Sequence, residues 1–228
     1  MSIYFVTGID TDAGKSYATG VMLRYLLASG VTATTFKLVQ TGSADGASAD
    51  ILLHRRIAGI PLDEFDRARK TCPEVYTYPA SPHLAAELDS RPLDTAKILA
   101  ALAEVKAAFE VVLVEGAGGL LAPLTRGISM GDFAAEQDWR AIIVTSGKLG
   151  SINHTLLTIE AAVRRGLEVC AVLYNAYPPS DDVIGGDTRA FLREYLEQHL
   201  PRTVWAEVPL VAESGDVAPM DYSAIFGV

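Results

Sequence analysis

The segment from Gly8 to Ser16 holds the residues whose types and spacing most plainly suggest chemistry. It reads Gly-Ile-Asp-Thr-Asp-Ala-Gly-Lys-Ser and directly follows an apolar run over residues 3–6. A glycine-rich loop between a strand and a helix can turn its backbone N–H groups toward phosphate oxygens. The helix start adds partial positive charge, Lys15 adds a full charge, and Ser16 offers a hydroxyl to Mg²⁺. The pattern predicts a P-loop that binds nucleotide phosphates.

The spacing within this loop departs from the usual P-loop. Counting back from the second glycine, the first glycine is expected where Ile9 stands, and Gly8 lies one residue further out. Two carboxylates, Asp10 and Asp12, therefore lie beside the expected phosphate. A chance Gly-Lys-Ser is the alternative, but the apolar run before the loop and the amphipathic run over residues 17–27 argue against it.

Lys37 ends a second apolar run, over residues 32–36. If that strand neighbours the first one, Lys37 emerges beside the P-loop and can stabilise charge that develops during phosphoryl transfer. Thr41 follows in a turn that could bring a hydroxyl to the same place. The alternative interpretation is a lysine that only marks the edge of the core.

Glu115 ends a third apolar run and is followed by a glycine-rich stretch that contains Gly116 and Gly118. A carboxylate at the tip of a buried strand is typical of the acid that helps to hold Mg²⁺ in P-loop enzymes. The glycines would let the backbone approach a phosphate. Asp50, at the start of a helical segment, is a further candidate oxygen ligand. The alternatives are an exposed Glu in a turn and an ordinary helix-start acid.

Two other strand ends carry polar candidates. Gly150, Ser151 and Asn153 precede a helix whose free N–H groups could bind a carboxylate, although Ser151 could instead be a simple helix cap. Asn175 ends another apolar run, and its amide could hydrogen-bond an adenine edge. Turn chemistry is the alternative for this asparagine.

The cysteines and the remaining histidines form no metal or redox spacing. Cys170 lies in an apolar run and is interpreted as a small buried hydrophobe, while Cys72 has no cysteine close to it. We interpret His54, His83 and His199 as surface or helix residues. No nucleophile-elbow pattern is present, so covalent acyl chemistry has no support.

Apolar runs and helical patterns alternate along the chain, which predicts an α/β fold with a mainly parallel central sheet and helices on both faces. Strands are expected at residues 2–7, 32–36, 111–115, 141–145, 169–174 and 204–208. Helices are expected at residues 15–28, 47–58, 95–108, 152–165 and 187–199. Residues 59–94 are proline-rich and predict an irregular excursion with a short helix around residues 83–88. We expect one domain over residues 1–228.

Composition narrows the function classes. The chain has 228 residues, of which 50% are hydrophobic, enough for a substantial core. Its net charge of −9 argues against a general nucleic-acid or anionic-membrane surface. Neither a secretory signal nor a membrane-length apolar stretch is evident. We therefore expect a cytoplasmic protein that binds neither nucleic acid nor membrane.

Taken together, several segments closely resemble the dethiobiotin synthetase family, in the same order from residue 3 to about residue 213. They are residues 6–16, Lys37 with Val39, Thr41 and Gly42, residues 81–83, residues 114–119 with Pro123 and Leu124, and residues 148–155. The resemblance implies a homodimeric α/β protein of the P-loop NTPase type. It also implies ATP- and Mg²⁺-dependent joining of CO₂ to 7,8-diaminopelargonate through a carbamate and a carbamic-phosphoric anhydride, giving dethiobiotin, ADP and phosphate.

The resemblance also implies residue roles, with Lys15 and Lys37 as the catalytic cations. The nucleotide would contact Asp12, Ala13, Gly14, Lys15, Ser16, Glu115, Gly116, Gly118, Asn175, Val208, Pro209, Leu210 and Glu213. Mg²⁺ would contact Ser16, Asp50 and Glu115. The diamine substrate would contact Thr11, Asp12, Lys37, Thr41 and Gly118, and its distant carboxylate would contact Gly150, Ser151, Ile152 and Asn153 of the partner subunit.

The chain departs from the family pattern at a few positions. Ser16 and Asp12 stand where Thr and Glu are usual, Leu38 replaces a usual Pro, and Ile9 replaces a common Thr. None of these departures removes a charged catalytic group.

Three other functions are alternatives for a chain with this P-loop. A partitioning or cell-division switch ATPase carries a signature lysine five residues before the P-loop lysine, where this chain has Asp10. A regulatory nucleotide-binding module would not require Lys15, Lys37, Asp50 and Glu115 together. Another ATP-dependent amide- or ring-forming enzyme stays open, because the expected pocket is built largely from backbone.

Overall fold

The computed structural model describes residues 2–176, 181–209, 218 and 220–228. Within them, one six-stranded sheet has the order β2-β3-β1-β4-β5-β6, and every neighbouring pair is parallel. The strands are β1 (Ser2–Gly8), β2 (Ala33–Lys37), β3 (Val111–Gly119), β4 (Arg140–Ser146), β5 (Val169–Asn175) and β6 (Val204–Val208). The predicted α/β class with a parallel sheet is confirmed. β3 runs on through the glycine-rich stretch, beyond the predicted end at Glu115.

The helices lie between these strands and after the last one. They are α1 (Lys15–Ala28), α2 (Ala49–Ala58), α3 (Glu64–Arg67), α4 (Pro82–Leu88), α5 (Thr95–Ala108), α6 (Met130–Glu136), α7 (Ser151–Arg164), α8 (Asp182–His199) and α9 (Ser223–Phe226). The sequence did not predict α3, α6 or α9, which are too short for a clear helical period. α6 is fixed instead by a capping box between Ser129 and Asp132. α8 begins at Asp182 rather than at residue 187, because Asp181 caps it.

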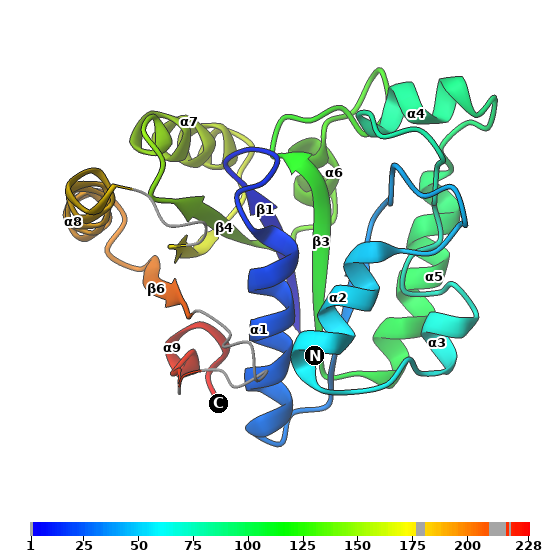
Figure 1. The fold of residues 1–228 in the computed structure, drawn as a ribbon, viewed down its shortest axis with the longest axis horizontal. Coiled ribbons are helices and arrows are strands. Elements are labelled where there is room, and N and C mark those ends of the chain that lie inside the picture. Colours follow the sequence, from blue (N-terminus) through cyan, green and yellow to red (C-terminus); the bar gives the residue numbers. More distant parts are fainter. Residues whose placement is uncertain (1, 177–180, 210–217, 219) are drawn as a thin grey trace.

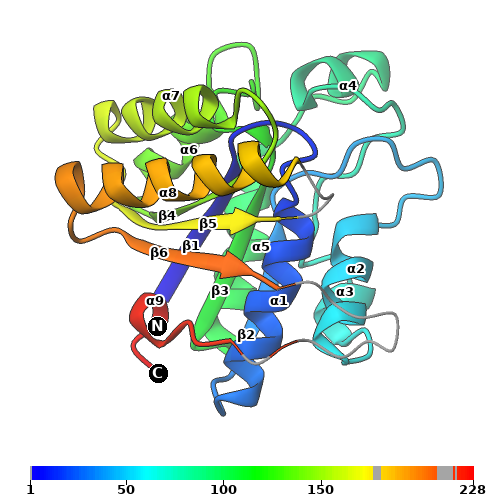
Figure 2. The same cartoon turned by 60° about the vertical axis from the view of Figure 1, so that its left-hand side comes forward.

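Helices cover both faces of the sheet (Figures 1 and 2). α1, α2 and α9 pack on one face around side chains such as Leu23 and Leu113, which are fully buried. α5, α6, α7 and α8 pack on the other face around side chains such as Phe5 and Ile159. Each fully buried side chain of this size stabilises the fold by roughly 1.5–3 kcal/mol. The two cores hold the strand ends rigidly at one edge of the sheet.

The strand order answers the condition on which the prediction for Lys37 depended. β2 does not neighbour β1, because β3 lies between them. Glu115 on β3 therefore pairs with Val6 on one side and with Lys37 on the other. β1 has β3 and β4 as its neighbours, so the strand order reverses at β1, where ligands of open parallel sheets bind. The loop after β1 lies at this edge, at the top of Figure 1.

Candidate active site

The loop between β1 and α1 has the conformation of a phosphate-binding helix start. Gly14 precedes α1 with a φ of +91°, and no side chain caps the first turn. The backbone N–H groups at this helix start can therefore donate to an anion. A Cβ atom on Gly14 would lie 2.0 Å from Nδ2 of Asn175, which donates to the carbonyl of Ala13 at 3.1 Å. Only glycine fits here, and Asn175 braces the loop from behind.

Lys15 folds back over this loop. Its Nζ donates to the carbonyl oxygen of Asp10 at 3.0 Å, and a Cβ atom on Gly8 would lie 2.9 Å from the same oxygen. Burial lowers the pKa of Lys15, and Lys37 lowers it further, against the opposing effect of Glu115. Asp12 takes a φ of +60°, which Asp tolerates better than most residues. The displaced glycine and the left-handed aspartate accommodate the unusual spacing.

A hydroxyl at the start of α1, a carboxylate at the start of α2 and a carboxylate within β3 meet at this edge. Oγ of Ser16 lies 2.9 Å from Oδ1 of Asp50 and 2.8 Å from Oε1 of Glu115. Nζ of Lys37 lies 2.6 Å from Oδ2 of Asp50 and 2.7 Å from Oε1 of Glu115, and it also donates to the carbonyl of Gly116 at 2.9 Å. The two carboxylates predicted to hold Mg²⁺ already contact a cation, the ammonium group of Lys37.

The electrostatics of this cluster keep both central groups charged. Burial by itself raises the pKa of Glu115, but Lys37 and His54 outweigh it and hold the pKa well below its usual range. Burial by itself lowers the pKa of Lys37, but Glu115 and Asp50 outweigh it and raise the pKa above its usual range. Glu115 is fully buried, so its charge depends entirely on these partners.

His54 is the residue of this cluster that the sequence analysis missed. It is not a surface residue: it is fully buried on α2, with Nε2 2.7 Å from Oε2 of Glu115 and Nδ1 2.9 Å from Oγ1 of Thr35. One signal could have identified it. His54 follows Asp50 by four residues in a predicted helix, which places both side chains on one helix face.

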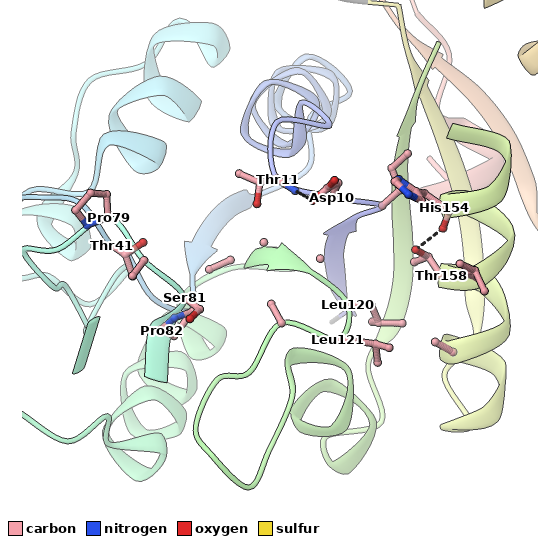
Figure 3. A pocket seen from close by; sticks show the side chains of 18 residues that line it. Asp10, Thr11, Thr41, Pro79, Ser81, Pro82, Leu120, Leu121, His154 and Thr158 are labelled. Atoms are coloured by element: carbon pink, nitrogen blue, oxygen red, sulfur yellow. Dashed lines mark hydrogen bonds between the residues drawn. The ribbon is translucent and has the colours of Figure 1, made fainter. Parts of the chain in front are cut away.

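Two cavities open at this edge of the sheet. The smaller, of about 320 Å³, is lined by the P-loop together with Lys37, Asp50 and Glu115. The larger, of about 750 Å³, lies between the loops after β1 and β3, the start of α4 and the side of α7 (Figure 3). The residues that line both are Thr11, Thr41, Ala117 and Gly118. The two cavities therefore meet beside Lys37.

The walls of the larger cavity are mainly apolar. Figure 3 shows Pro79 and Pro82 on one side and Leu120 and Leu121 below, with Thr11 at the P-loop end. Most of these wall residues had no predicted role, because the proline-rich excursion that supplies several of them has no period to place it.

The start of α7 lies near this cavity. Gly150 precedes the helix with a φ of +94°, and α7 begins at Ser151, one residue earlier than predicted. Oγ of Ser151 is 2.9 Å from Oγ of Ser146, so Ser151 is not the helix cap that the alternative interpretation required. Gly150 and Asn153 are exposed. α7 lines the cavity with later residues, among them His154 and Thr158.

The predicted adenine side is described only in part. Val208 is buried at the end of β6, and the carbonyl of Pro209 accepts a hydrogen bond from Oη of Tyr17 at 2.8 Å. Leu210 and Glu213 lie outside the described residues. The proposed roles of these residues and of Asn175 toward adenine stay predictions.

Elsewhere the described residues offer few chemical groups. Both cysteines are buried, as expected for Cys170, and burial raises the pKa of each thiol to about 12. In the described part of the chain, no three His, Cys, Asp or Glu side chains group closely enough to hold a metal by themselves. None of the described helices combines the length and apolar character needed to cross a membrane.

Comparisons with known proteins agree with this arrangement. A family described as an AAA domain matches residues 3–218. ATP-dependent dethiobiotin synthetase BioD 2 of Pasteurella multocida is 44% identical over 210 residues, which cover 92% of this chain and 98% of the relative. BioD 2 of Haemophilus influenzae is 46% identical over 179 residues, 78% of this chain and 93% of the relative. BioD of Chlorobaculum tepidum is 39% identical over 220 residues, 93% of this chain and 90% of the relative.

More distant solved structures share the fold. A Borrelia burgdorferi protein assigned to plasmid partition and bound to AMPPNP has a TM-score of 0.55 at 11% identity, over 98% of this chain and 93% of its own. The signal recognition particle receptor FtsY of Elizabethkingia anophelis with GDP has a TM-score of 0.53 at 13% identity, over 99% of this chain and 62% of its own. These likenesses confirm the P-loop NTPase type of fold. The identities of 39–46% with the relatives named above show that the chain belongs to the ATP-dependent dethiobiotin synthetase family.

Proposed function

We propose that this protein converts 7,8-diaminopelargonate, CO₂ and ATP into dethiobiotin, ADP and phosphate, a step of biotin biosynthesis. The observation that carries the proposal is the meeting of two unlike cavities at Thr11 and Gly118. The smaller one offers a helix start and lysines, which suit a triphosphate. The larger one offers apolar walls, which suit the alkyl chain of the diamine.

In the proposed reaction, the diamine and the triphosphate of ATP meet where the two cavities join. An amine of the substrate adds to CO₂, loses a proton, and becomes a carbamate. A carbamate oxygen attacks the γ-phosphorus of ATP, and ADP leaves. The second amine then attacks the carbamate carbon, closes the five-membered urea ring and expels phosphate. Carbamate and ATP are both anions, so Lys15 and Lys37 act by positioning and by offsetting charge rather than by covalent chemistry.

The residues around Lys37 fit Mg²⁺. This ion usually takes one or two carboxylates and completes its shell with phosphate oxygens and water, so it needs no all-protein cage. Asp50, Glu115 and the hydroxyl of Ser16 supply such a set, and a cation already lies between the two carboxylates. When bound there with ATP, Mg²⁺ would neutralise charge that develops on the phosphates.

We also propose a homodimer in the cytoplasm. Leu121 and Leu157, which line the larger cavity, are each 55% exposed, and Leu149, just before the start of α7, is 86% exposed. A second copy seated there would bury these leucines and bring its own Gly150 and Asn153 toward the distant carboxylate of the substrate. Leu149→Asp should give a monomer by light scattering that binds nucleotide normally and forms less product. A variant that remains a dimer would contradict this interface.

One assay tests the proposed reaction. The protein is incubated with ATP, Mg²⁺, bicarbonate and 7,8-diaminopelargonate, and also with each component left out. Phosphate release should require all of them, and mass spectrometry should find a product heavier than the diamine by one CO₂ less one water. ATP turnover without the diamine, or an unchanged diamine mass, would overturn the proposal. Diamines of other chain length in the same assay test the rival of a different acid substrate.

A further inference from the structure

His54 is a buried polar residue to which the proposed reaction gives no part. Its side chain, on α2, is fully buried against β2 and β3, and each ring nitrogen has a hydrogen-bonding partner in those strands, Glu115 or Thr35. A buried imidazole that contacts the metal-binding carboxylate has the geometry of an outer-shell residue, which orients a ligand without touching the ion.

The hydrogen bonds of the ring have a definite direction. Glu115 is a carboxylate and can only accept, so Nε2 of His54 donates its proton to Oε2. Oγ1 of Thr35 accepts from Nη1 of Arg55 at 3.0 Å. The hydroxyl proton of Thr35 is then free to point at Nδ1 of His54. Donation thus runs from Arg55 through Thr35 and His54 to Glu115.

Further hydrogen bonds hold Arg55, the first donor in this series. Arg55 also donates to Oγ1 of Thr34 at 3.0 Å and to both carboxylate oxygens of Asp66, at 2.7 and 2.8 Å. The side chain of Asp66 is 2% exposed. Oγ1 of Thr71 donates to Asp66, and the carbonyl of Thr71 accepts the backbone N–H of Lys37. The same network therefore ties α2 to β2, the strand that carries Lys37.

The two oxygens of Glu115 have different partners as a result. His54 occupies Oε2, so Oε1 alone meets Ser16 and Lys37. We infer that His54 is a positioning residue, which holds Glu115 so that Oε1 faces the metal and the nucleotide phosphates. This inference rests on the proposed function, because it takes Glu115 as a metal-binding residue. It gives α2 two tasks, since Asp50 binds the metal one turn before His54 orients its partner ligand.

Three substitutions of His54 separate positioning from packing. His54→Gln keeps an amide N–H near the place of Nε2 and can still donate to Glu115. His54→Asn has a shorter side chain whose amide reaches only the place of Nδ1 and Thr35. His54→Leu removes both hydrogen bonds. Thr34→Val serves as the matched control, because it removes one hydrogen bond of Arg55 from the same buried network without touching Glu115.

The readout is binding rather than turnover. The affinity for ADP is measured by calorimetry with Mg²⁺ and with EDTA, and the ratio of the two affinities gives the gain due to the metal. Outer-shell changes reduce metal affinity or activity by roughly 10- to 100-fold, so we expect the gain to fall at least about tenfold in the Leu and Asn variants. We expect the Gln and Thr34→Val variants to keep the gain within about threefold of wild type. Melting temperatures without ligand check that each variant is folded.

The outcomes distinguish this inference from the proposed function. If His54→Leu keeps the wild-type gain, or if Gln loses as much as Asn, His54 does not position Glu115 and the inference is overturned. If the wild-type protein binds ADP equally well with and without Mg²⁺, the metal site itself is wrong, and the inference is overturned with it. A loss in Leu and Asn with recovery in Gln supports the inference even if all variants melt at lower temperature.

Discussion

Helices α1 and α7 begin in the same way but in different surroundings. Each has 14 residues, follows a buried strand, and is preceded by a glycine in the left-handed region, with no side chain capping the first turn. From the sequence, both starts are predicted to bind an anion. The starts differ in what lies next to the two glycines, Gly14 and Gly150.

The two helix starts differ in how many groups of the described chain surround them. At Gly14 the loop is packed against Asn175, and Lys15, Lys37 and Glu115 line the cavity beside it. Among the described residues, none beyond the chain neighbours of Gly150 has a heavy atom within 4 Å of the place where a Cβ would be, and the preceding leucine is 86% exposed. A helix start supplies the N–H groups, but its neighbours decide the chemistry. The groups at the α1 site all come from this chain, whereas we propose that the start of α7 becomes a site only against a second copy.

The largest expected effect comes from adding one methyl group at each start. Gly14→Ala would place a Cβ 2.0 Å from Nδ2 of Asn175 and would also strain the backbone. We expect ATP affinity to fall more than about a hundredfold, or about 2.7 kcal/mol, by calorimetry. Gly150→Ala is the matched control, with the same left-handed strain of about 1–2 kcal/mol but open space around it. Equal losses of ATP affinity in the two variants would contradict the claim that the two helix starts differ in nucleotide binding.

A second test weakens the ion pair between Arg55 and Asp66, which belongs to the network behind the α1 site. Asp66→Asn leaves Arg55 without its charged partner, and we expect about 2 kcal/mol less stability at pH 7 by urea denaturation. Burial raises the pKa of Asp66, but hydrogen bonds and charge from Arg55 outweigh it and hold the pKa below its usual range. The stabilisation is therefore complete above about pH 4 and is lost as the pH falls through the folded pKa. An equal difference between the two proteins at pH 7 and pH 3 would contradict this assignment.

The third test concerns charge at the α1 site alone. Lys37→Gln should lower turnover more than tenfold, or about 1.4 kcal/mol or more of barrier, because Lys37 offsets charge in the transition state. We expect ATP binding in excess Mg²⁺ to change little, since the P-loop and Lys15 remain. Rapid-quench measurement of phosphate formation checks the rate, and nucleotide titration checks the binding. Turnover at the wild-type level would show that Lys37 lies outside the chemistry.

Much of the fold and of the α1 site could be predicted from the sequence. The apolar runs placed every strand of the described sheet, and the residues after those runs met at one edge as parallel strands require. Lys37 and Glu115 were both predicted at the phosphate site, but the strand order was left open, since a run of β-branched residues does not reveal its neighbour. The result held because strand ends share an edge whichever strands are adjacent.

The rest depended on packing that no local pattern encodes. His54 looked like an ordinary helical histidine, since its burial depends on how α2 packs against β2 and β3. The walls of the larger cavity come from the proline-rich excursion and from α7, which are far apart in the sequence. The contact of Asn175 with the loop at Gly14 was likewise not predicted, whereas its role toward adenine stays a prediction. Such contacts join segments that lie far apart in the sequence, and no repeating pattern of residues indicates them.

The most direct test of the central claim follows the oxygen atoms of CO₂. If a carbamate oxygen attacks the γ-phosphorus where the two cavities meet, ring closure leaves that oxygen on phosphate and the second one in the ring carbonyl. In a single turnover with freshly dissolved ¹⁸O-labelled bicarbonate, ATP, Mg²⁺ and 7,8-diaminopelargonate, mass spectrometry should find phosphate that carries one labelled oxygen from the carbamate. Phosphate without label, formed together with the product, would mean that water attacked the nucleotide and would contradict this account.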